Sequence, residues 1–159
     1  MHIAIGSDHA GFRLKEQLKE HLLATGHTVE DKGTFSDDST DYPDYAHAVA
    51  RDVAEKKVDL GIVICGSGNG VNITANKHHG VRSGLAWNVE VAEVIRQHND
   101  ANVLALPARF ISTEEAIAIT EVFLKTDFEG GRHQRRVACL LYTSPSPRDR
   151  TRSRMPSSA

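Results

Sequence analysis

The chain has 159 residues, which is enough for one domain with one hydrophobic core. Its residues are 40% apolar and 25% charged, and its formal net charge is −2, so the composition gives no indication of a nucleic-acid or membrane partner. Two cysteines exclude a disulfide framework and indicate a reducing compartment. The N-terminus lacks the layout of a signal peptide, and no apolar run approaches the roughly 18 residues that span a bilayer. We therefore expect a cytoplasmic protein.

Short apolar runs alternate with amphipathic stretches along the chain. The runs predict strands over residues 2–6, 27–31, 60–65, 81–86 and 103–106. Helical spacing follows the first run at Leu14, Leu18 and Leu22, with Gly26 as a stop. Later helices are expected after Pro43, which suits a helix start, over residues 71–77, up to about His98, and after Ser112, which forms a capping box with Glu115.

Five alternations of strand and helix predict an α/β fold with a five-stranded parallel sheet covered on both faces. In such sheets the ligand lies beyond the carboxyl ends of the strands. The unusual residues of this sequence fall at those ends: Asp8 with His9, residues 65–70, and residues 107–109. We therefore expect the functional site at that edge of the sheet.

The last 21 residues, 139–159, do not follow this pattern. They contain three of the five prolines and four arginines beside one acidic residue, a composition that predicts disorder. The stretch CLLYTSPSPRD also has the sequence of a translated sequencing-library adaptor, so we interpret residues 1–138 as the native domain, with its C-terminal helix truncated. A natural disordered tail is the alternative. On the adaptor interpretation, Cys139 is foreign and Cys65 is the only native thiol.

The most informative segment is Cys65-Gly66-Ser67-Gly68-Asn69-Gly70. A cysteine closes a buried strand, and a glycine-rich turn leads into a helix, so backbone N–H groups can gather around an anion. A thiol in such a place can act as a base or a nucleophile. A small buried residue before a flexible turn is the alternative.

Two familiar nucleotide loops do not fit this sequence. A Walker loop ends in Gly-Lys-Ser/Thr, whereas this loop continues Asn69-Gly70-Val71. The first loop, Gly6-Ser7-Asp8-His9-Ala10-Gly11, lacks the Gly-x-Gly-x-x-Gly spacing of a dinucleotide site. A nucleotide is therefore disfavoured.

Two further polar pairs lie at predicted element ends. Asp8 could hold a sugar hydroxyl and His9 a phosphate, although Asp8 could equally cap the first helix. His98 could act as an acid or base near neutral pH, or it could simply meet the dipole of its helix. The sequence has no HExxH or paired-cysteine spacing, and the adjacent His78 and His79 point in different directions, so we expect no metal site.

Several motifs occur in order: GSDHAGF, DKGT with TDYPDYA, CGSGNGVNITANK, RQHNDANVL and EGGRHQRR. Together they resemble the ribose-5-phosphate isomerase B family over about residues 2–138. That family also includes galactose-6-phosphate isomerase subunits and enzymes of allose 6-phosphate. The resemblance implies a Rossmann-like three-layer α/β/α subunit, and a homodimer or tetramer whose active site is shared across an interface. It also implies interconversion of ribose 5-phosphate and ribulose 5-phosphate through an enediolate, within the pentose phosphate pathway and without a metal or cofactor.

The resemblance also implies a role for each motif residue. Cys65 is the base that moves a proton between C1 and C2; one branch of the family uses a Glu where this chain has Val71, so the Cys branch is indicated. Ser67 and the backbone of Gly66, Gly68, Asn69 and Gly70 stabilise the enediolate, with help from Asn99. His98 opens the sugar ring, while Asp8 and Tyr42 contact hydroxyls. His9 and Arg109, with Arg132 and Arg136 of the neighbouring subunit, bind the phosphate.

Competing functions remain at this stage. A hexose-6-phosphate isomerase is the rival of the same class, and the His in QHND favours the pentose substrate. A non-catalytic phosphate-binding domain with a flavodoxin-like sheet is a weaker rival, since a phospho-receiver would place Asp at the position of Cys65. The sequence departs from the family after RHQRR, where the helix that carries Arg132 and Arg136 runs into the tail.

Overall fold

The computed structural model describes residues 1–141, and the predicted tail from residue 142 onward lies outside the described residues. Strands and helices alternate as the sequence predicts. The strands are β1 (His2–Ser7), β2 (Thr28–Asp31), β3 (Leu60–Cys65), β4 (Ser83–Leu85) and β5 (Val103–Pro107). The helices are α1 (Phe12–Ala24), α2 (Tyr42–Ala54), α3 (Asn69–Ala75), α4 (Val89–Asn99), α5 (Thr113–Lys125) and α6 (Arg132–Leu141), with a 3₁₀ turn η1 (His9–Gly11) before α1.

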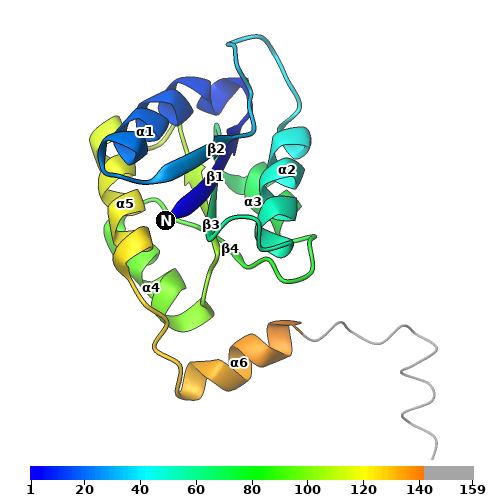
Figure 1. The fold of residues 1–159 in the computed structure, drawn as a ribbon, viewed down its shortest axis with the longest axis vertical. Coiled ribbons are helices and arrows are strands. Elements are labelled where there is room, and N and C mark those ends of the chain that lie inside the picture. The colour runs from blue at the N-terminus through cyan, green and yellow to red at the C-terminus, as the bar shows by residue number, and fades with distance from the viewer. Residues whose placement is uncertain (142–159) are drawn as a thin grey trace, which may run out of the picture.

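All strand pairs are parallel, in the order β2-β1-β3-β5-β4. Two apolar layers cover the sheet: α1, α4 and α5 pack on one face, and α2 and α3 pack on the other. The predicted three-layer α/β/α sandwich with a five-stranded parallel sheet is thus confirmed (Figure 1). Strand β3 is buried at every position, as its unbroken apolar sequence predicts.

The order of the strands places a switch point between β1 and β3. From β1 the chain passes through α1 to the neighbouring β2, whereas from β3 it passes through α3 on the opposite face toward β4. Loops leaving β1 and β3 therefore diverge, and they open a crevice beyond the carboxyl ends of these strands. This crevice contains Asp8 and Cys65.

The helix boundaries follow local chemistry. Pro43 lies in the first turn of α2, and the capping box between Ser112 and Glu115 opens α5, both as predicted. The prediction was wrong at α3, which begins at Asn69 and not at residue 71. Gly68 adopts a left-handed conformation with φ of 75°, so the turn closes there and Asn69 and Gly70 already belong to the helix.

Helix α6 stands apart from the three layers. Among the described residues it packs mainly on α4, and it extends from the body below the other helices (Figure 1). The helix continues to Leu141, so residue 138 is not an end of secondary structure and the exposed Cys139 is helical. No helix among residues 1–141 is long and apolar enough to cross a membrane.

Candidate active site

The loops after β1, β3 and β5 and the start of α2 enclose a hollow of about 300 Å³ at the carboxyl edge of the sheet. Most of the residues predicted to bind substrate meet here. The lining is formed by Asp8, His9, Ala10, Tyr42, Cys65, Gly66, Ser67, Gly70 and Arg109. The structure therefore brings together the predicted base, the glycine loop and two predicted phosphate ligands, His9 and Arg109.

Cys65 ends β3 with its thiol pointing into the glycine loop. The side chain is 5% exposed, and its Sγ accepts a hydrogen bond from the backbone N–H of Gly68 at 3.2 Å. Such a donor stabilises negative charge on sulfur. Among residues 1–141, the backbone N–H groups of Gly66 and Ser67 have no hydrogen-bond partner, so they remain available to an oxyanion in the hollow.

Two glycines of the loop allow other side chains to lie close to the backbone. A Cβ at Gly70 would lie 2.6 Å from the Tyr42 ring, so only glycine leaves room for the ring over the start of α3. A Cβ at Gly66 would lie 3.2 Å from Arg109, whose backbone N–H also donates to the carbonyl of Gly66 at 3.0 Å. The loop after β5 is thereby fixed against the loop after β3.

Asp8 and His9 occupy the opposite wall. Asp8 is buried and caps η1, since its carboxylate accepts from the N–H of Gly11 at 3.1 Å. Asp8 thus caps the 3₁₀ turn that leads into α1, whose own N-cap is Gly11, and Asp8 also lines the hollow. The half-buried His9 contacts Thr40, two residues before Tyr42.

Four predicted site residues lie elsewhere. Because α4 runs back from the carboxyl end of β4, His98 and Asn99 lie at the amino edge of the sheet, next to the start of β5. Arg132 and Arg136 lie on α6, which packs on α4. Within one chain, these four residues do not meet Cys65.

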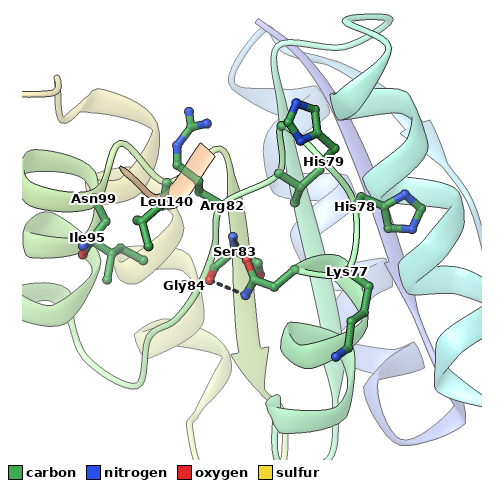
Figure 2. A pocket seen from close by; sticks show the side chains of 13 residues that line it. Lys77, His78, His79, Arg82, Ser83, Gly84, Ile95, Asn99 and Leu140 are labelled. Atoms are coloured by element: carbon green, nitrogen blue, oxygen red, sulfur yellow. Dashed lines mark hydrogen bonds between the residues drawn. The ribbon is translucent and has the colours of Figure 1, made fainter. Parts of the chain in front are cut away.

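A larger hollow, of about 590 Å³, lies at that amino edge. Figure 2 shows Asn99 and Ile95 of α4 facing the segment from Lys77 to Ser83, with Leu140 of α6 beside them. This hollow has a basic rim, but it lacks a buried nucleophile and the glycine loop. The smaller hollow therefore has the chemistry expected of an active site, in spite of its size.

A cluster of possible metal ligands occurs next to the amino edge. Ligand atoms of His98, Glu129 and His133 lie within 4.8 Å of one another. The two imidazole rings are stacked, however, with centroids 4.2 Å apart and an interplanar angle of 11°, so their in-plane lone pairs do not converge. Burial, His98 and Arg132 lower the pKa of His133. The arrangement fits ring stacking better than cation binding.

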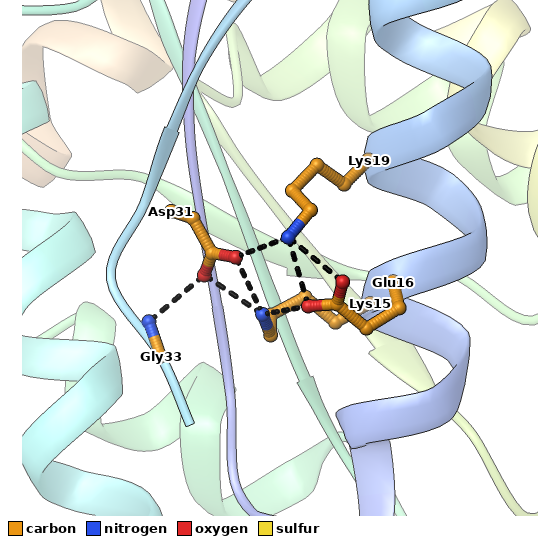
Figure 3. A network of polar contacts seen from close by, with 5 residues as sticks. All are labelled: Lys15, Glu16, Lys19, Asp31 and Gly33. Carbon is orange, nitrogen blue, oxygen red and sulfur yellow. Dashed lines mark hydrogen bonds and ion pairs between the residues drawn. The ribbon is translucent and has the colours of Figure 1, made fainter. Parts of the chain in front are cut away.

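An ion network, which the sequence analysis did not anticipate, lies between α1 and the carboxyl end of β2. The fully buried Nζ of Lys15 lies 2.8 Å from Asp31 and 2.7 Å from Glu16, and Lys19 joins both carboxylates (Figure 3). Burial alone would raise the pKa of Asp31, but the two lysines and the N–H of Gly33 outweigh it and lower that pKa. The network connects α1 to the end of β2, where the loop toward Thr40 and Tyr42 begins.

Comparisons with known proteins show which family this chain resembles. A family profile described as Ribose/Galactose Isomerase matches residues 3–140. Ribose-5-phosphate isomerase B of Escherichia coli (strain K12) is 48% identical over 138 residues, which cover 87% of this chain and 93% of that protein. The corresponding enzyme of Mycolicibacterium paratuberculosis is 44% identical over 142 residues, or 88% of this chain and 89% of that one.

Solved structures give the same result. A ribose 5-phosphate isomerase from Thermotoga maritima has a TM-score of 0.86 and 47% identity, covering 87% of this chain and 96% of its own. Ribose-5-phosphate isomerase B of Mycoplasma genitalium, solved with bound ribulose 5-phosphate, has a TM-score of 0.85 and 42% identity and covers 97% of both chains. This chain therefore belongs to the ribose/galactose isomerase family.

Proposed function

We propose that this chain interconverts D-ribose 5-phosphate and D-ribulose 5-phosphate. The observation that carries the proposal is the position of Cys65, a buried thiol beside free backbone N–H donors, in a hollow that also presents Asp8, Tyr42 and Arg109. The relatives named ribose-5-phosphate isomerase B, one of them holding ribulose 5-phosphate, support this substrate. An aldose–ketose isomerase must remove a carbon-bound proton and stabilise the enediolate that forms, and this hollow has groups for both tasks.

In the proposed mechanism Cys65 takes the proton from C2 of the opened ribose and returns it to C1. The N–H groups of Gly66 and Ser67 donate to the developing oxyanion, and one such donor typically contributes about 3 kcal/mol to the transition state. Asp8 and Tyr42 hold sugar hydroxyls, while His9 and Arg109 hold the phosphate. The phosphate supplies binding energy away from the reacting carbons and orients the sugar. None of these steps uses a redox cofactor or a metal ion.

Ring opening needs a second subunit. We assign ring opening to His98 and an accessory role on the enediolate to Asn99, yet both lie at the amino edge while Cys65 lies at the carboxyl edge. One chain cannot bring these edges together, whereas a second copy can place its amino edge over the first copy's Cys65. The projecting α6, with Arg132 and Arg136, would then reach the phosphate of the neighbour. The proposed assembly is a homodimer, or a tetramer built from it.

A direct assay tests the proposed function. Purified full-length chain is incubated with ribose 5-phosphate in the presence of EDTA, and ribulose 5-phosphate formation is followed. Residues 1–138 are assayed in parallel. Turnover by the full chain supports the metal-free isomerase, and the ratio of the two activities measures what the last 21 residues contribute. A folded, dimeric full chain that does not convert ribose 5-phosphate but converts allose 6-phosphate or galactose 6-phosphate would replace the pentose by a hexose.

A further inference from the structure

The contact between His9 and Thr40 is more extensive than one hydrogen bond. The backbone N–H of His9 donates to the Thr40 hydroxyl at 3.2 Å, and the backbone N–H of Thr40 donates to Nδ1 of the His9 ring at 3.1 Å. The Thr40 carbonyl oxygen lies 3.3 Å from the same Nδ1. Thr40 therefore holds both the main chain and the ring of His9.

The direction of the ring contact determines where the proton of the neutral imidazole lies. Nδ1 can accept from the Thr40 N–H at 3.1 Å or donate to the Thr40 carbonyl at 3.3 Å, and the shorter contact favours an unprotonated Nδ1 with the hydrogen on Nε2. Nε2 has no hydrogen-bond partner among residues 1–141, and His9 lines the hollow with Cys65 and Arg109. The ring thus presents a donor to an anionic or hydroxyl oxygen of the ligand.

The position of Thr40 in the chain also connects His9 with the other side of the hollow. It lies two residues before Tyr42, whose ring packs over Gly70 beside the Cys65 loop. The segment from Thr40 to Tyr42 therefore contacts two walls of the hollow. Thr40 contacts His9 on one wall, and Tyr42 contacts the glycine loop on the other. This segment begins where the Lys15–Asp31 network anchors Gly33.

We propose that Thr40 is a positioning residue, which fixes the orientation and tautomer of His9 so that Nε2–H faces the substrate. The proposal rests on the proposed function for the identity of the substrate, but the ring orientation it asserts belongs to the ligand-free chain. It assigns no chemical step to Thr40. The expected consequence of weakening the contact is weaker substrate binding, with the proton transfer at Cys65 largely retained.

The first test needs no substrate. Nitrogen-15 NMR of the full chain labelled at histidine reports the protonation of each ring nitrogen, and the His9 signals are assigned by their loss in His9→Gln. We expect a His9 ring with unprotonated Nδ1 and protonated Nε2 in the neutral form, and the same tautomer in Thr40→Ala, which keeps the backbone N–H that Nδ1 accepts. A wild-type ring protonated at Nδ1 would overturn the proposal, even if the chain has no isomerase activity.

The second test is a double-mutant cycle with ribose 5-phosphate. Thr40→Ala should raise KM about 3- to 10-fold, the range of one neutral hydrogen bond, with kcat within about twofold of wild type. Thr40→Ser retains the hydroxyl and should restore KM, and Thr25→Ala, which removes a hydroxyl bonded to the C-terminus of α1, is the matched control. In the His9→Ala background, Thr40→Ala should have no further effect. An equal loss in that background would show that Thr40 acts on the loop in general and not through His9.

Discussion

The two edges of the sheet differ in how much of a site each contains. The carboxyl edge has a buried thiol, a glycine loop and fixed polar walls, all positioned by contacts within one chain. The amino edge has His98, Asn99 and a basic rim around a larger hollow, but no thiol among residues 1–141 lines that hollow. The comparison indicates that the proposed active site needs groups from both edges, and that the volume of a hollow is a poor guide to where the proposed base lies.

The sharpest test of the carboxyl edge is the thiol itself. Cys65→Ser keeps the shape of the hollow and the hydrogen bond from Gly68, but replaces the base with a far less acidic hydroxyl. We expect kcat to fall by about 10²- to 10⁴-fold, the usual contribution of a positioned acid–base group. Substrate binding, measured by calorimetry, should be retained. A loss of less than tenfold would remove Cys65 from the proposed mechanism.

The relation between the edges can be tested by complementation. Cys65→Ser and His98→Asn are each expected to be nearly inactive as homodimers. When the two variants are unfolded and refolded together, half of the dimers are mixed, and one of the two sites in each mixed dimer combines wild-type Cys65 with wild-type His98. The mixture should therefore regain about a quarter of wild-type activity, by this counting and the symmetry of a twofold dimer.

Absence of any recovery, with mixed dimers demonstrated by mass spectrometry, would place His98 and Cys65 of one chain in one site. That result would contradict the arrangement of α4 and β3. The proposed sharing of the site between subunits would then be wrong, although the assignment of Cys65 would be unaffected.

Substitutions in the Lys15–Asp31 ion network should lower the stability of the fold more than they lower the rate of the reaction. Asp31→Asn leaves the fully buried ammonium of Lys15 with one carboxylate in place of two, and we expect a loss of about 3 kcal/mol in the free energy of unfolding, as for other broken buried pairs. Asp37→Asn, which breaks the exposed pair with Arg13, should cost less than about 1 kcal/mol. Urea denaturation of the three proteins measures both values.

The same network predicts a pH dependence. Because the pKa of Asp31 is lowered in the folded chain, its contribution is complete above the ordinary carboxyl range and is lost as the pH falls through the folded value. The stability difference between wild type and Asp31→Asn should therefore be constant near neutral pH and shrink in acid. A difference that grows in acid would contradict the lowered pKa.

A smaller effect on substrate binding is expected from a substitution at Gly70, where the ring of Tyr42 packs against the start of α3. In Gly70→Ala the new methyl group would lie 2.6 Å from the ring of Tyr42, which is 40% exposed and can move outward. We expect KM to rise by about tenfold, the value of 1.4 kcal/mol of lost binding, with little change in melting temperature. In a Tyr42→Ala background the same substitution should be nearly silent, because the ring it displaces is absent.

The sequence predicted the carboxyl edge better than the amino edge, for a physical reason. Parallel strands place all their carboxyl ends at one edge, so Asp8, Cys65 and Arg109 could be brought together from strand order alone. His98 lies in the last turn of a helix that returns to the other edge, and in the proposed assembly its relation to Cys65 depends on a second chain. The burial of Lys15 was also not predictable, because a lysine beside Leu14 on an amphipathic helix has the pattern of an ordinary surface residue.

Thr40 illustrates the same limit. The polar stretch around it predicts a loop, but no periodicity or motif indicates which loop residue will reach the ring of His9. The contact joins residues 31 positions apart, and it exists only because β2 pairs with β1 and returns the chain beside η1. Local patterns in the sequence therefore identify the residues that carry the chemistry more readily than those that position them.

The smallest expected effect concerns the amino edge. His78, in the segment before β4, has a lowered pKa because of its burial and the neighbouring His47 and Arg51, and its Nε2 lies 2.7 Å from Nδ1 of His47. The unfolded chain therefore binds more protons than the folded chain as the pH falls through about 6.5, so stability should decrease there. His78→Asn should flatten the slope of melting temperature between about pH 7 and 5, and His79→Asn, at the adjacent exposed histidine, is the control. If the slope persists in His78→Asn, protonation of the His47–His78 pair is not the cause of the loss of stability in acid. The loss would then arise from His98 and His133, which are stacked between α4 and α6.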